Sequence, residues 1–98
     1  VGHDVTAISD GRAVVATAGT RVPLAASTAA KHAIITALET NVGVIRVGGA
    51  TVAAGPAGSE RGIPLRARDS VSLPCDNLAD IKIDATVSGE GVEYAWLA

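Results

Sequence analysis

The feature that most constrains this chain is the alternation of apolar and polar residues in short runs that end at Gly, Pro, Asn or Asp. The clearest run covers residues 80–87. Its predicted inward set is Ile81, Ile83, Ala85 and Val87, and its predicted outward set is Lys82, Asp84 and Thr86. A period of two is that of a β-strand, and we therefore predict an all-β fold. A single open sheet would leave one apolar face bare, so the expected architecture is a small antiparallel β-sandwich or jelly-roll-like barrel of seven or eight short strands.

The same pattern predicts the other extended segments, which are 12–18, 20–25, 31–40, 44–53, 63–65, 70–73 and 92–96. Pro23 cannot donate a ladder hydrogen bond, so segment 20–25 is expected at a sheet edge. Segment 31–40 is partly apolar on both faces, which predicts a central strand covered by the second sheet on one side and by a neighbouring segment or subunit on the other. Residues 1–98 are expected to form one domain, with residues 1–10 as an extended arm.

Turn-forming residues separate these segments. Ser9-Asp10-Gly11 and the stretch 88–91 have the composition of turns. Gly48-Gly49 is predicted to be a two-residue hairpin that places Val47 opposite Ala50 and Ile45 opposite Val52. The Gly-rich stretch 55–62 is expected to be an exposed loop that makes contacts, and 25–30 a connecting loop.

The expected core is thin and aliphatic. The chain has no Phe or Met, and its large aromatic residues are Tyr94 and Trp96, which we interpret as core or subunit-interface anchors. Val, Ile, Leu and Ala must fill the rest, and each contributes less buried area than an aromatic residue. A domain of this size is marginally stable, so oligomer contacts are expected to supplement the core.

Charge and composition argue against several classes of protein. The formal net charge is -2 with mixed signs, which does not provide the basic surface of a nucleic-acid-binding protein. No apolar run reaches the roughly 20 residues of a membrane span, and no basic stretch followed by a hydrophobic one marks a secretory leader. Cys75 is the single cysteine, so no internal disulfide is expected, in keeping with synthesis in a reducing cytoplasm.

The residues that carry chemistry are scattered. His3, His32 and Cys75 match no metal-ligand or nucleophile signature, and we interpret them as structural or surface residues. Asp80 and Asp84 would lie about 13 Å apart along one strand face, too far to share an ion. Asp76 and Asn77 are expected to cap a turn through side-chain hydrogen bonds. The sequence therefore predicts no catalytic, cofactor-binding or metal-binding residues, and a protein that is not an enzyme.

A cluster of mixed charge suggests where a protein partner could bind. Glu60, Arg61, Arg66 and Arg68 surround the exposed loop and its return to the sheet. Arginine is enriched at protein interfaces because its planar guanidinium makes bidentate pairs. These residues are predicted to contact a partner.

Several segments resemble, in order and pattern, the small β-sandwich virion proteins of tailed bacteriophages, which include capsid decoration or cement proteins and modules of head fibres. The residues that carry the resemblance are Thr20–Leu24, His32–Ala37, Asn41–Gly49, Gly62–Leu65, Asp69–Leu73 and Leu78–Ala85. The chain departs from the family pattern at Arg66-Ala67-Arg68-Asp69, where a glycine-containing turn is usual, so an altered turn is expected there.

This resemblance implies a virion protein that assembles in the bacterial host cytoplasm, binds the major capsid protein on the capsid surface, and stabilises the head, as a homo-oligomer and specifically a trimer. It carries no catalytic residues across. The alternative is a receptor- or carbohydrate-binding β-sandwich module of a phage fibre or tail, with loop residues or Trp96 at its site.

Overall fold

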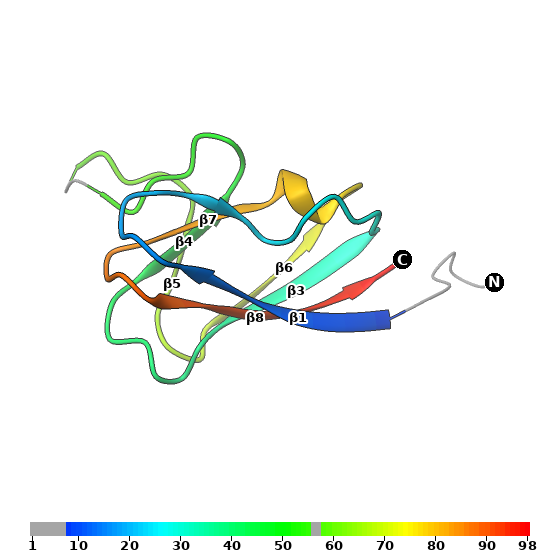
Figure 1. The fold of residues 1–98 in the computed structure, drawn as a ribbon, viewed down its shortest axis with the longest axis horizontal. Coiled ribbons are helices and arrows are strands. Elements are labelled where there is room, and N and C mark those ends of the chain that lie inside the picture. The colour runs from blue at the N-terminus through cyan, green and yellow to red at the C-terminus, as the bar shows by residue number, and fades with distance from the viewer. Residues whose placement is uncertain (1–7, 56–57) are drawn as a thin grey trace.

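The computed structural model describes residues 8–55 and 58–98, and within them the regular secondary structure is almost entirely β-strand (Figure 1). The elements are β1 (Ile8–Val15), β2 (Val22–Pro23), β3 (His32–Ala37), β4 (Ile45–Gly48), β5 (Ile63–Leu65), β6 (Ser70–Pro74), the 3-10 helix η1 (Leu78–Asp80), β7 (Lys82–Ala85) and β8 (Glu90–Leu97). The strands form two four-stranded sheets with the orders β1-β8-β3-β6 and β2-β7-β4-β5. The predicted all-β sandwich is confirmed.

The order of pairing is that of a jelly roll. β1 pairs with β8, β2 with β7, β3 with β6 and β4 with β5, all antiparallel. The chain is thus folded back on itself like one long hairpin. Two further antiparallel pairs, β3 with β8 and β4 with β7, roll that hairpin into two facing sheets.

The core between the sheets is aliphatic, as predicted. Its buried residues are Ala13, Val15, Leu24, Ala30, Ala33, Ile35, Ala37, Ile45, Val47, Leu65, Leu78, Ile81, Ile83, Ala85 and Val92. Tyr94 and Trp96 are half-buried and pack against this cluster, in agreement with the expected role as core anchors. Both lie on the face of β8 that carries Val92, because residues two apart in a strand share a face.

Strand β1 begins earlier than predicted. Ser9-Asp10-Gly11 is part of the strand and not a turn, and Gly11 lies opposite Tyr94 of β8. A Cβ atom at position 11 would meet the Tyr94 hydroxyl, so the glycine makes room for the neighbouring ring and not for a reversal of the chain. Of the predicted arm, residues 8–10 belong to β1, and residues 1–7 lie outside the described residues.

The predicted hairpin at Gly48-Gly49 is wrong. A turn does occur here, with the Val52 amide donating to the Gly49 carbonyl oxygen at 3.1 Å, but β4 pairs with β5 and β7 and not with the segment after the turn. Val47 therefore lies opposite Ile63 and Ile83. Neither glycine has the positive φ that a two-residue hairpin turn requires.

The alternation predicted in residues 80–87 holds except at two positions, Val87 of the inward set and Asp84 of the outward set. Ile81, Ile83 and Ala85 are buried, whereas Val87 is exposed because β7 ends at Ala85. Asp84, predicted to face water, is only 2% exposed.

The positions of β2 and β3 agree with the predictions. β2, which contains Pro23, is an edge strand, and β3 is central, between β8 and β6. Asn77 caps η1 as expected, because its side-chain oxygen accepts from the amides of Ala79 at 2.9 Å and Thr28 at 3.0 Å. Within the described part of the chain, no helix has the length and apolar character needed to span a membrane.

Candidate protein-binding surface

The outer faces of the two sheets differ in what covers them. On the β2-β7-β4-β5 sheet, the segment that follows β4 folds back over the strands and buries Val52 and Ala54. The Arg21 guanidinium holds this segment by donating to the carbonyl oxygens of Val52 and Ala50, each at 3.3 Å. The outer face of this sheet is therefore partly closed by its own chain.

Asp84 fastens the same segment to β7. Its carboxylate accepts from the backbone amides of Ala54 at 2.9 Å, Gly19 at 3.1 Å and Ala85 at 2.8 Å. A buried carboxylate is stable only when hydrogen bonds replace its lost hydration, and here three amides supply them. Asp84 is thus a structural anchor.

The outer face of the β1-β8-β3-β6 sheet, called the open face below, has no such cover among residues 8–55 and 58–98. Directly opposite residues in antiparallel strands share a face, so the register defines its members. They are Ile8, Asp10, Arg12 and Val14 of β1, Gly91, Glu93, Ala95 and Leu97 of β8, His32, Ile34 and Thr36 of β3, and Ser70, Ser72 and Pro74 of β6. Three large apolar members are well exposed: Ile8 at 73%, Ile34 at 44% and Val14 at 43%.

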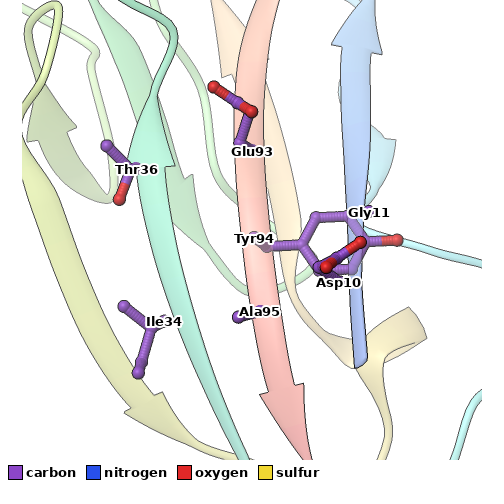
Figure 2. Close-up of a pocket in the computed structure, with 7 residues that line it drawn as sticks. All are labelled: Asp10, Gly11, Ile34, Thr36, Glu93, Tyr94 and Ala95. Carbon is purple, nitrogen blue, oxygen red and sulfur yellow. The ribbon is translucent and has the colours of Figure 1, made fainter. Parts of the chain in front are cut away.

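A shallow depression of about 530 Å³ lies on this sheet (Figure 2). Ala95 of β8 is small, and it lies between Ile34 and Thr36 on β3 and Asp10 on β1. Glu93 also lines the depression, beside Thr36 in the register. Figure 2 shows the Tyr94 ring extending from β8 toward β1, where Gly11 has no side chain. The depression combines an apolar floor with the carboxylates of Asp10 and Glu93 and the hydroxyl of Thr36.

Polar pairs join β3 to β6 at one side of the open face. His32 Nε2 lies 2.5 Å from Ser72 Oγ, and Thr36 Oγ1 lies 2.7 Å from Ser70 Oγ. An imidazole beside a hydroxyl is the first element of a nucleophile–base pair, but a catalytic pair also needs a group that orients the base and a site that excludes water. Neither accompanies His32 among the described residues, and we interpret both contacts as cross-strand pairs that stabilise the sheet.

The predicted contact residues are exposed and lie at two places. Arg61 follows Glu60 and pairs with Ala53 through two backbone hydrogen bonds, two residues before β5 begins. Arg66 and Arg68 lie in the turn after β5, where Arg68 forms an exposed ion pair with Glu39 at 3.7 Å. The structure brings Glu60 and Arg61 together at one end of β5, and Arg66 and Arg68 at the other.

The pKa values of Glu60 and Cys75 differ from the ordinary values of these groups. Hydrogen bonds from its own backbone amide and that of Gly58 hold the pKa of the exposed Glu60 below its ordinary value, since both favour the carboxylate. Burial, with smaller contributions from Asp76 and Asp80, raises the pKa of the Cys75 thiol. A raised pKa lowers the thiolate fraction at neutral pH and makes Cys75 a poor nucleophile.

The described residues contain no group of three or more His, Cys, Asp or Glu side chains that could hold a metal ion. The prediction from sequence did not name the open face, although it expected segment 31–40 to be covered on its second face by a neighbouring segment or subunit. That expectation came from the two apolar faces of segment 31–40, and in the structure Ile34, on the open face, is 44% exposed.

Comparison with protein-family models, with curated proteins and with solved structures finds no match to this chain.

Proposed function

We propose that this protein is a non-enzymatic virion protein that binds the major capsid protein of a tailed bacteriophage and stabilises the head. The observation that carries the binding part of the proposal is the open face. A small protein that leaves Ile8, Val14 and Ile34 exposed on one sheet has a surface suited to a protein partner.

The arrangement of the open face supports a partner that is itself a folded surface. The face is broad, its apolar residues are separated by the charged pair Arg12 and Glu93, which lie 3.8 Å apart, and its depression is shallow. Protein–protein interfaces likewise mix apolar area with polar and charged contacts. A capsid shell offers such a surface in many copies.

The capsid part of the proposal rests on analogy. The family resemblance points to decoration proteins, and jelly rolls are common among viral capsid proteins. The same architecture also occurs in lectins, so the fold alone does not select between them.

Ile34 provides the test of the open face. Replacement of Ile34 by Glu places a charge at the centre of the proposed interface, and we expect capsid binding to weaken about tenfold or more because that charge would be buried without a partner. Val42→Glu is the matched control, since Val42 is 85% exposed in the loop between β3 and β4 and lies off the face. The measurement is co-sedimentation with empty capsids assembled from the major capsid protein of the same phage. Equal binding by both variants would overturn the role of the open face.

Charge reversals test the predicted contact residues separately. Arg61→Glu and Arg66→Glu lie at opposite ends of β5, so each reports on one end alone. The variant whose changed residue contacts the shell should associate with capsids more slowly, because electrostatic complementarity is lost. Neither variant should unfold the sandwich. If the wild type itself does not bind capsids, the proposed function fails.

The depression supports a second candidate, a carbohydrate-binding module. Asp10, Glu93 and Thr36 could accept or donate hydrogen bonds to sugar hydroxyls above the apolar floor at Ala95. A glycan array distinguishes this candidate, because saturable binding lost in Asp10→Ala would favour it over the capsid.

A further inference from the structure

The edge strands of the two sheets are not equally protected against pairing. A proline interrupts hydrogen bonding at an edge, and three of the four edges contain one: Pro23 in β2, Pro64 in β5 and Pro74 in β6. The fourth edge is β1 (Ile8–Val15), which is eight residues long and contains no proline. Figure 1 shows β1 (blue) along the border of its sheet beside β8. An exposed, long edge strand is a template for a further strand.

We propose that β1 pairs with β1 of a second copy of this chain, antiparallel and about a two-fold axis at Gly11. In this register Asp10 lies opposite Arg12 of the second copy, and Arg12 opposite its Asp10. Ile8 lies opposite Val14 in the same way. Each exposed side chain of the edge thus meets a complementary one, acid with base and apolar with apolar, which is the self-complementarity that a two-fold interface requires.

The charges of β1 also select the register. If the register shifts by two residues in one direction, Asp10 lies opposite Asp10 of the second copy. If it shifts by two residues in the other direction, Arg12 lies opposite Arg12 of the second copy. Like charges directly opposite each other are destabilising, so both neighbouring registers are disfavoured.

The surroundings of the strand fit the same pairing. Arg12 already contacts Glu93 of its own chain at 3.8 Å, so Asp10 of the second copy would extend this contact into a row of alternating charge. Asp10 has no ion pair of its own within residues 8–55 and 58–98. The inward positions Ser9, Gly11 and Ala13 carry small side chains that leave space for a second copy. The product is one continuous eight-stranded sheet with a doubled open face.

This inference does not rest on the proposed function. Two-fold pairing through β1 also differs from the three-fold assembly that the family resemblance implies. A chain that dimerises through β1 and does not bind capsids would support the inference and overturn the proposed function. A chain that binds capsids and does not pair through β1 would support the proposed function and overturn the inference.

The test uses complementary charge variants and sedimentation equilibrium. In a dimer of Asp10→Arg chains both charged pairs become Arg–Arg, and in a dimer of Arg12→Asp chains both become Asp–Asp. The dissociation constant of each variant dimer should therefore be about ten times that of the wild type or greater. A mixture of the two variants restores both opposite-charge pairs and should form heterodimers. Chains with Asp10→Arg keep the Arg12–Glu93 contact, so loss of that contact cannot explain their weaker self-association or its recovery in the mixture.

A control and a cross-link complete the experiment. Thr51→Arg adds a charge to an exposed turn after β4, on the side of the other sheet, and should not change the dimer. In a Cys75→Ser background, chains with Asp10→Cys should form a disulfide with chains carrying Arg12→Cys more readily than with each other, because Cβ atoms of directly opposite residues lie about 5 Å apart and diagonal ones about 7 Å. This readout remains if a charge variant fails to fold. The proposal would be overturned if the wild type is monomeric or forms a trimer insensitive to Asp10→Arg. It would also be overturned if the two charge variants do not associate when mixed, or if Thr51→Arg weakens the dimer.

Discussion

At position 84 a single carboxylate ties three parts of the chain together. Its oxygens accept from Gly19 before β2, from Ala54 after β4 and from Ala85 in its own strand. The two more distant partners come from loops, so Asp84 determines how these loops lie on the sheet. It stabilises the covered outer face, and thereby the difference between the two faces.

Asp84→Ala should lower the free energy of unfolding by about 3 kcal/mol or more, because buried amides lose a charged acceptor. Asp80→Ala is the matched control: Asp80 is exposed in η1, and its loss should change stability by about 0.5 kcal/mol or less. Urea denaturation of both variants measures the difference. Similar small effects would mean that Asp84 does not anchor the loops.

The role of Asp84 could not be predicted from sequence. Alternation assigns each residue to a face of its strand, and it placed Asp84 correctly on the outward side of β7. It does not report whether a distant loop covers that side, and the covering residues lie 30 and 65 positions away in the chain. The core residues of β3 and β7 were predictable because burial between two sheets requires only the strand period.

At the scale of elements, the turn after β5 forms without the glycine that its geometry favours. The Asp69 amide donates to the Arg66 carbonyl oxygen at 2.9 Å, and Arg68 takes a left-handed conformation with φ 73°. That region costs a residue with a side chain about 1 kcal/mol. The turn predicted to be altered is therefore closed tightly, with strain at Arg68.

Arg68→Gly should raise the free energy of unfolding relative to Ala67→Gly by about 1 kcal/mol, since both add a flexible glycine and only the first relieves strain. Thermal unfolding of the two variants measures the difference. Glu39→Gln removes the exposed ion pair to Arg68 without touching the backbone, and so corrects for its small contribution. If Arg68→Gly is less stable than Ala67→Gly, the left-handed conformation of Arg68 does not strain the turn.

The failed hairpin at Gly48-Gly49 has a physical cause at the same scale. A glycine pair between two apolar runs favours a hairpin only if the second run lacks a better place to pack. Here Val52 and Ala54 are buried against the outer face of the sheet, held by Arg21 and Asp84, while β5 takes the place beside β4. Local turn chemistry could not reveal this competition between distant segments.

At the scale of the whole molecule, the fold class was predictable and the strand order was not. Regular spacing of short alternating runs indicates a sandwich, but many connections are compatible with it. The jelly-roll order follows from pairing the first strand with the last, a contact between Ile8–Val15 and Glu90–Leu97 that no local pattern encodes. The same pairing leaves β1 at an edge and exposes the open face, so both proposals depend on it.

The central claim is that this protein binds a capsid shell, and cryo-electron microscopy of the virion tests it most directly. We predict density for the sandwich on the outer surface of the head, at symmetry-related positions, with the open face against the major capsid protein. Particles that lack the protein should show a bare shell that ruptures more readily on heating. Density at the tail, or the absence of the protein from the particle, would contradict the account.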